Sequence, residues 1–195
     1  MNENSYLFTL SMFCIVCILL FALFAGAETI TLNIGDKAPN FYANDDNGDL
    51  WELEKHLGKN YVIVYFYPAA LTGGCTKQAC SYRDNKKELS KLDVDIIGIS
   101  GDPVKNLKIF KDIHDLNFSL LSDVSGDIAK KFGVPLKDGG EIKKTIEGTV
   151  FSLGRSYTEA RWTFIIGKDG NVIYKDTEVN AENDSKNVIN FLKAL

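Results

Sequence analysis

Histidine and cysteine, two common kinds of metal ligand, are scarce in this sequence, whose 195 residues include only two histidines and four cysteines. The two histidines, His56 and His114, and the cysteines do not have the spacing of metal ligands. Only four prolines occur, and there is no Pro-rich linker, internal repeat or low-complexity tract. The lysines are scattered among acids and the net charge is -4, which argues against a nucleic-acid-binding surface. One domain with a sizeable apolar core is the expectation.

Charge is absent from Ser5 to Ala27, a stretch of about 23 residues. The stretch is apolar and ends in the small residues Ala25-Gly26-Ala27, which predicts a signal peptide over residues 1–27 and export to the periplasm or the secretory pathway. The residues before the apolar stretch include Glu3 but no Lys or Arg, and the stretch is long enough to span a bilayer core of roughly 30 Å. A retained membrane anchor is therefore the alternative, and membrane association is expected only in that case. A start at Met12 is a third reading.

Two of the cysteines, Cys14 and Cys17, lie inside this apolar stretch. Cysteine is a small apolar side chain in such surroundings, so we interpret this C-x-x-C as part of the targeting segment. The predicted mature domain, residues 28–195, then contains only Cys75 and Cys80 as cysteines.

Strands alternate with helices in the predicted domain. The run YVIVYFY is continuously apolar and aromatic and VDIIGIS is mostly apolar, which predicts strands buried on both faces, and a helix-compatible segment follows each. The expected elements are a hairpin around Asp45–Asp49, strands at Tyr61–Tyr67, Val94–Ser100 and Phe118–Leu121, and helices at Cys75–Leu92, Pro103–Asp115 and Asp127–Phe132.

The C-terminal part contains RWTFIIGKDGNVIYKD, which predicts two strands joined by a turn at Lys168–Gly170, and then an amphipathic helix at Asn183–Leu195. The preceding segment 137–159 is glycine-rich and polar, and is expected to be a surface excursion that could turn at Glu147-Gly148. The whole order predicts an α/β fold, with a central mixed β-sheet flanked by helices and an N-terminal β-hairpin.

Cys75 follows Gly73-Gly74 at the start of a predicted helix. A cysteine attacks as its thiolate, and the unpaired N–H groups and dipole of a helix N-terminus favour negative charge. Thr72 could be the N-cap, or its hydroxyl could turn toward the sulfur. Spacing alone leaves open that Cys75 is an inert buried thiol behind a capping threonine.

Cys75 and Cys80 are five positions apart. On an intact helix their α-carbons would be roughly 8 to 9 Å apart. A disulfide needs about 4.4 to 6.8 Å, so the two could bond only if the first helical turns unwind.

Arg161 begins the predicted strand RWTFII, where a period of two places Arg161, Thr163 and Ile165 on one face. A charged residue at this position is ordinarily a solvated strand end. Beside a cysteine, however, it would favour the thiolate and could hydrogen-bond a peroxide or a developing oxyanion.

Four motifs occur together: Pro68-(x)3-Thr72-(x)2-Cys75, the overlapping CTKQACSYRD, the distant RWTF, and IGDKAPNF at Ile34–Phe41. Together they resemble the peroxiredoxins, specifically the bacterioferritin comigratory protein or Q-type class of the AhpC/TSA family. The resemblance covers about Ile34 to Leu195 and implies a thioredoxin-like fold.

The resemblance also implies a thioredoxin-dependent peroxidase, with Cys75 as peroxidatic and Cys80 as resolving cysteine. Thr72 and Arg161 would activate the thiol, and Pro68 would shield it. Cys75 sulfenic acid, formed by hydrogen peroxide or an organic hydroperoxide, would condense with Cys80, and a thioredoxin-like protein would reduce the disulfide. No metal, haem or flavin cofactor is implied, and a monomer or weak dimer is expected.

The chain departs from the family in two places. It has PAALTGGC where the family often has PKDDTPGC, and its 137–159 excursion is longer than in compact members. These differences leave substrate preference and oligomeric state open. The alternatives are an exported thiol-disulfide oxidoreductase, although such sites usually carry C-x-x-C, and a noncatalytic thioredoxin-like binding module. An exported peroxidase would also need a reductant delivered into an oxidising compartment.

Overall fold

The computed structural model describes residues 31–146 and 148–195. The predicted signal peptide or membrane anchor at 1–27 lies outside the described residues. Within them, no helix is both long enough and apolar enough to cross a membrane.

Five strands form the central sheet, in the order β5-β4-β3-β8-β9. Strands β3 (Tyr61–Phe66), β4 (Val94–Ser100) and β5 (Ser119–Ser122) are parallel, whereas β8 (Trp162–Ile166) is antiparallel to β3 and β9 (Val172–Asp176) is antiparallel to β8. The sheet is therefore mixed, as predicted. Parallel neighbours need crossover helices, and these are α2 (Gly73–Leu89) after β3 and α3 (Val104–His114) after β4.

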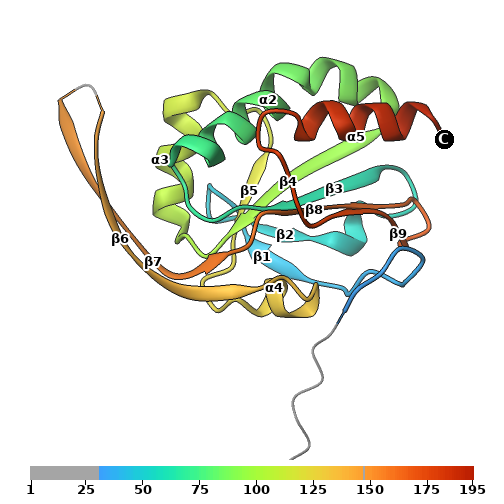
Figure 1. The fold of residues 1–195 in the computed structure, drawn as a ribbon, viewed down its shortest axis with the longest axis horizontal. Helices are drawn as coiled ribbons and strands as arrows, with labels where there is room; N and C mark the ends of the chain where they lie inside the picture. The colour runs from blue at the N-terminus through green and yellow to red at the C-terminus, as the bar shows by residue number, and fades with distance from the viewer. Residues whose placement is uncertain (1–30, 147) are drawn as a thin grey trace, which may run out of the picture. The chain divides into compact units, whose positions relative to one another are not determined.

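Helices and a hairpin cover the two faces of the sheet. Helices α2, α3 and α5 (Asp184–Lys193) lie on one face, while α4 (Asp127–Lys131) lies on the other with β1 (Tyr42–Asn44) and β2 (Leu50–Glu52) (Figure 1). Alternate residues of β3 divide between the two resulting cores, because side chains of a strand point to opposite faces. Ile63 and Tyr65 belong to the core under α2, and Val62 and Val64 to the core under α4.

The N-terminal hairpin is confirmed, since β1 and β2 pair antiparallel from Tyr42↔Glu52 to Asn44↔Leu50. Helix α2 begins two residues before the predicted start, at Gly73, because Thr72 already occupies the N-cap position with extended backbone angles. Its end at Leu89 is followed by a single turn of 3-10 helix, Ser90–Leu92.

The polar excursion is a long antiparallel ribbon. Strands β6 (Leu136–Ile146) and β7 (Thr149–Glu159) pair from Leu136↔Glu159 to Ile146↔Thr149 and extend beyond α3 (Figure 1). Apolar side chains on one side of the ribbon, including Ile142 and Phe151, pack against the core under α2 and α3. The excursion is therefore regular structure, held by tertiary contact that a polar composition does not reveal.

Candidate active site

Cys75 is the third residue of α2 and only 1% exposed. The chain leaves β3 and turns sharply before this helix. Leu71 has a φ of 61°, a left-handed conformation that is costly for a branched side chain, and Thr76 N–H donates to Thr72 O at 2.8 Å to close the first turn. This turn places Cys75 in the first turn of the helix, where the unpaired N–H groups favour negative charge.

Arg161 is the cationic partner of this sulfur. Its Nη2 donates to Cys75 Sγ at 3.3 Å, although the two residues are 86 positions apart. Antiparallel pairing explains their approach: Trp162 at the start of β8 lies opposite Phe66 at the end of β3, so Arg161 faces the point where the chain turns into α2. Of the two readings open for Arg161, the structure selects contact with the thiol.

The backbone at Gly74 runs close to this contact. A Cβ built on Gly74 would lie 3.3 Å from Arg161 Nη2, which is tighter than ordinary contact. A side chain there would require the guanidinium to shift by a few tenths of an ångström. Gly73 is different, since a Cβ there would meet no atom within 4 Å and the residue is exposed.

Thr72 occupies the N-cap position of α2, as one of the two expectations had it, but its hydroxyl is engaged elsewhere. Its Oγ1 donates to Ala69 O at 2.9 Å, and it makes no side-chain cap of α2. No hydrogen bond joins it to Cys75 Sγ in the part of the chain that the structure describes. The hydroxyl instead closes the turn that it terminates, because the positive φ of Leu71 brings the Ala69 carbonyl within reach. Pro68 begins the same loop and is half-buried, and its shielding role stays a prediction.

Cys80 lies on the same continuous helix as Cys75, and both thiols are free. It is half-buried and opens onto a shallow surface groove that Lys77, Ser81 and Asn85 also line. Burial raises the pKa of the Cys80 thiol above its ordinary value. In the folded helix, Cys80 is therefore a poor nucleophile at neutral pH.

Behind Arg161 lies a polar group that sequence reasoning missed. Arg161 Nη1 donates to Gln78 Oε1, and Gln78 Nε2 donates to Asp184 Oδ2 at 2.6 Å. Helical spacing could have indicated Gln78, because it lies three residues after Cys75 and on the same face of α2. Nothing in the sequence pointed to Asp184, which reaches the site only through the packing of α5 on α2.

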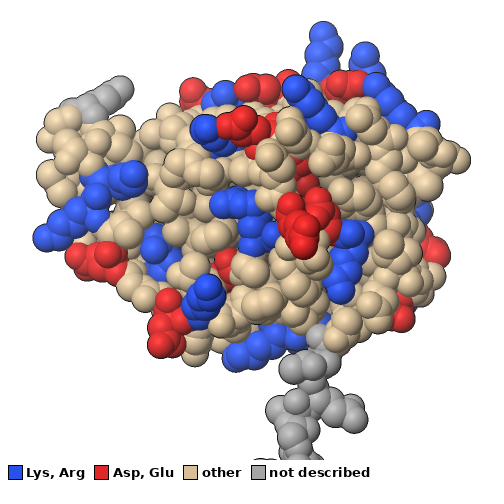
Figure 2. Space-filling view, viewed as in Figure 1, with Lys and Arg blue, Asp and Glu red and all other residues tan. Residues whose placement is uncertain are grey.

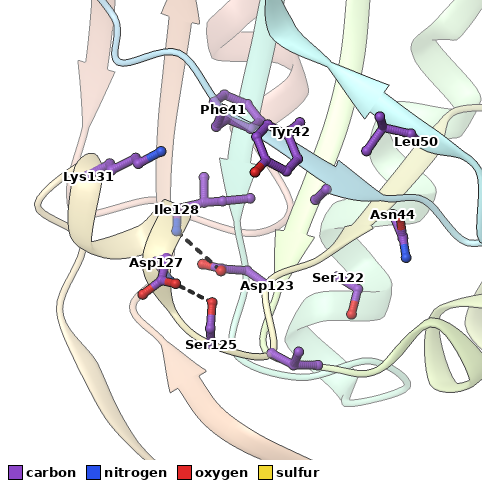
Figure 3. A pocket seen from close by; sticks show the side chains of 12 residues that line it. Phe41, Tyr42, Asn44, Leu50, Ser122, Asp123, Ser125, Asp127, Ile128 and Lys131 are labelled. Atoms are coloured by element: carbon purple, nitrogen blue, oxygen red, sulfur yellow. Dashed lines mark hydrogen bonds between the residues drawn. The ribbon is translucent and has the colours of Figure 1, made fainter.

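A separate hollow of about 350 Å³ lies between the N-terminal hairpin and the loop before α4 (Figure 3). It contains none of the predicted site residues. Asp123 lines it, but its carboxylate is already engaged, because Ile128 N–H and Ala129 N–H donate to it. The other residues that line it include Phe41, Tyr42, Leu50, Val124 and Lys131.

The charged surface has no single sign on the face drawn in Figure 2, where Lys and Arg stand among Asp and Glu. Among the described residues, no three His, Cys, Asp or Glu side chains are placed to hold a metal ion. The site itself offers a buried thiol with a guanidinium beside it.

Comparison with known proteins agrees with this geometry. A model of the AhpC/TSA family matches residues 34–175. Peroxiredoxin Bcp of Escherichia coli (strain K12) is 37% identical over 163 residues, 83% of this chain and 96% of that protein. Chloroplastic peroxiredoxin Q of Oryza sativa subsp. japonica is 39% identical over 140 residues, 72% of this chain and 57% of that protein.

Solved structures resemble the fold. The crystal structure of peroxidoxin BcpB from Mycobacterium tuberculosis matches with a TM-score of 0.70 at 31% identity, covering 84% of this chain and 98% of that one. A PrxQ variant from Xylella fastidiosa matches with a TM-score of 0.70 at 24% identity, covering 85% of this chain and 98% of that one, a likeness of fold alone.

Proposed function

Because the chain belongs to the AhpC/TSA family and is a peroxiredoxin, a thiol-dependent peroxidase, we propose that Cys75 is its peroxidatic and Cys80 its resolving cysteine. The observation that carries this proposal is the 3.3 Å hydrogen bond from Arg161 Nη2 to Cys75 Sγ at the first turn of α2. A guanidinium and a helix N-terminus both stabilise a thiolate, which is the attacking form.

In the peroxide step, the Cys75 thiolate attacks the terminal oxygen of a hydroperoxide. The S–O bond forms as the O–O bond breaks, and the departing alkoxide or hydroxide takes a proton to leave as alcohol or water. Arg161 already touches the sulfur, so the same guanidinium is in place to stabilise the developing negative charge on oxygen. Cys75 becomes a sulfenic acid.

Access to this buried sulfur is proposed to run past Gly73, which is exposed and has open space around its α-carbon. Hydrogen peroxide and organic hydroperoxides are the proposed substrates. Pro68 is proposed to shield the thiol from the loop side. Thr72 acts on the peroxide only after its hydroxyl rotates away from Ala69 O, to which it now donates at 2.9 Å.

In the resolving step, Cys80 attacks the sulfenic sulfur and water leaves, giving the Cys75–Cys80 disulfide. This requires α2 to unwind, because a continuous helix keeps the two α-carbons roughly 8 to 9 Å apart. Unwinding also exposes Cys80 and removes the burial that raises its pKa, so the nucleophile is activated only when it can reach its target.

A thioredoxin-like protein is the proposed reductant, and hydroperoxide and this protein are the proposed partners of a monomer or weak dimer. We also propose export, with residues 1–27 as signal peptide or membrane anchor, and hence a reductant supplied in that compartment. N-terminal sequencing of the natural protein tests cleavage, and reduction of the disulfide by candidate thioredoxins tests the partner.

Intact mass tests the cysteine roles in the full chain carrying Cys14→Ser and Cys17→Ser, so that only Cys75 and Cys80 can react. Reduced protein given one equivalent of hydrogen peroxide should lose the mass of two hydrogens. Cys80→Ser should instead gain one oxygen, which peptide mapping places on Cys75.

Cys75→Ser is the matched control and should show neither change. If the reduced protein keeps its mass after exposure to peroxide, the assignment of Cys75 fails. If oxygen is trapped on Cys80 in the Cys75→Ser variant, the two roles are reversed.

A further inference from the structure

Asp184 is a fully buried carboxylate at the start of α5, 0% exposed. Its Oδ2 accepts three hydrogen bonds, from Gln78 Nε2 at 2.6 Å, Tyr82 OH at 2.8 Å and Thr163 Oγ1 at 2.9 Å. Burying a carboxylate is costly unless several donors satisfy it. Three donors converging on one oxygen hold this group in a single position.

The carboxylate decides which way the Gln78 amide points. Only the NH2 group of an amide can donate, so its 2.6 Å bond to Asp184 turns Nε2 toward α5 and leaves Oε1 facing Arg161. Arg161 Nη1 donates to that Oε1, and Arg161 Nη2 donates to Cys75 Sγ at 3.3 Å. A continuous chain of hydrogen bonds thus runs from Asp184 to the thiol. A reversed amide would present N–H groups to the guanidinium and break it.

Asp184 also joins the two elements that carry the reacting groups. Tyr82 and Gln78 belong to α2, which bears Cys75, and Thr163 is on β8, two residues after Arg161. A small movement of α2 against β8 would change the distance from guanidinium to sulfur. One buried oxygen bonded to both elements opposes that movement.

Three tyrosines surround Asp184, and none of them carries a charge at physiological pH. Burial raises the pKa of Tyr82 and Tyr65 well above the ordinary value, and that of Tyr174 to about 12, so all three phenols are neutral at physiological pH. Burial raises the pKa of Asp184, Asp176 raises it further, and the hydrogen bonds to Oδ2 oppose the rise.

We propose that Asp184 is a positioning residue of the peroxide step, which orients Gln78 so that Gln78 holds the Arg161 guanidinium against Cys75 Sγ. The proposal rests on the proposed function for the identity of the reacting sulfur. Gln78 lies between Cys75 and Cys80, so unwinding of α2 separates it from Asp184 before the disulfide closes. Asp184 therefore assists attack on peroxide and does not assist the resolving step.

The test compares Asp184→Asn with the wild type in the full chain, after circular dichroism has established that the variant folds. Stopped-flow measurement should give a rate constant for hydrogen peroxide lower by on the order of tenfold. The pH midpoint of iodoacetamide alkylation at Cys75, measured in a Cys80→Ser background, should move to higher pH. Disulfide formation after the sulfenic acid should be as fast as in the wild type or faster.

Glu182→Gln is the matched control. Glu182 is an acid two residues before Asp184 and also contacts α2, through Lys77, but it is exposed and does not touch Gln78. It should leave rate and midpoint unchanged. Gln78→Leu breaks the chain at its middle and should reproduce both losses. Adding Asp184→Asn to Gln78→Leu should then cost no more than about twofold, since residues that act through one another are not additive.

Two failures are distinguishable. If Asp184→Asn lowers the melting temperature but keeps the peroxide rate and alkylation midpoint of the wild type, Asp184 is structural only and this inference is wrong, while the proposed function stands. The same conclusion follows if the resolving step slows by the same factor as the peroxide step. If wild-type Cys75 does not react with peroxide at all, the proposed function fails, and the alkylation midpoint still tests Asp184, because it needs no peroxide.

Discussion

Replacing Asp102 by alanine should destabilise the fold and loosen the loop before the active-site helix. Asp102 lies just after β4 and is fully buried. Its Oδ2 accepts from Ala70 N–H at 2.8 Å and from Ser100 Oγ at 3.1 Å, and its Oδ1 accepts from Asn106 Nδ2 and Arg155 Nε, each at 3.1 Å. One carboxylate thus connects the active-site loop, α3 and the β6–β7 ribbon.

The magnitude follows from what the substitution leaves behind. The Arg155 side chain is 5% exposed and its ion pair is with Asp102, so alanine would strand a buried guanidinium, at a cost of about 3 to 5 kcal/mol. The buried Ala70 N–H also loses its acceptor, which costs about 1 to 3 kcal/mol and overlaps with the first term. Against a total stability of about 5 to 15 kcal/mol, Asp102→Ala should remove about a fifth or more.

Urea unfolding of Asp102→Ala, Arg155→Met and the double variant is the assay. Arg155→Met alone leaves a buried carboxylate without its cation, whereas the double variant removes both charges. The free energy of unfolding that the double variant loses should therefore be smaller, by about 1 to 3 kcal/mol, than the sum of the losses in the two single variants. Additivity within about 0.5 kcal/mol would refute the reasoning, because the two charges would then not be coupled. Amide exchange at Ala70 should accelerate in Asp102→Ala, since its acceptor is gone.

Three further substitutions test the site and the core. Arg161→Met should slow alkylation of Cys75 at pH 7 and lower the rate constant for reaction with peroxide by on the order of 100-fold. A peroxide rate constant within twofold of the wild type would contradict the role of Arg161 in activating the thiol. Burial raises the pKa of Glu159, whose two carboxyl oxygens have no hydrogen-bond partner among the described residues, so the folded chain keeps a proton that the unfolded chain releases above pH about 4.3. This group therefore lowers the free energy of unfolding as pH rises. In urea unfolding, Glu159→Gln should be more stable than the wild type at pH 7 and equally stable near pH 4. An equal gain in stability at both pH values would oppose this account. Gly98→Ala would place a Cβ 2.5 Å from the side chain of Tyr65 on β3, and thermal unfolding should show a loss of about 1 to 3 kcal/mol of stability. Gly154→Ala is the control, because its Cβ would meet no atom within 4 Å, and it should lose less than about 0.5 kcal/mol.

Local sequence determined most elements of this fold and one half of the site. The buried strands β3 and β4 could be predicted because their short apolar runs are rich in β-branched or aromatic residues and lie between turn residues. Cys75 could be placed at a helix start because strand, glycine turn and helix follow one another directly along the chain. The ribbon at 137–159 could not be predicted as two 11-residue strands, because its apolar side is defined only by the core it packs against.

The other half of the site depended on tertiary structure. Arg161 was expected near the thiol only through resemblance to a family, since its position beside Cys75 follows from the antiparallel pairing of β8 with β3. The sequence left the orientation of the Thr72 hydroxyl open between a helix cap and the sulfur, and it makes neither contact, because the strained backbone at Leu71 offers it the nearer Ala69 carbonyl. No pattern in the sequence indicated that Asp184 belongs to the site. A residue's local pattern specifies its own helix or strand, whereas contacts across 86 or 106 positions exist only once strand register and helix packing have brought those elements together.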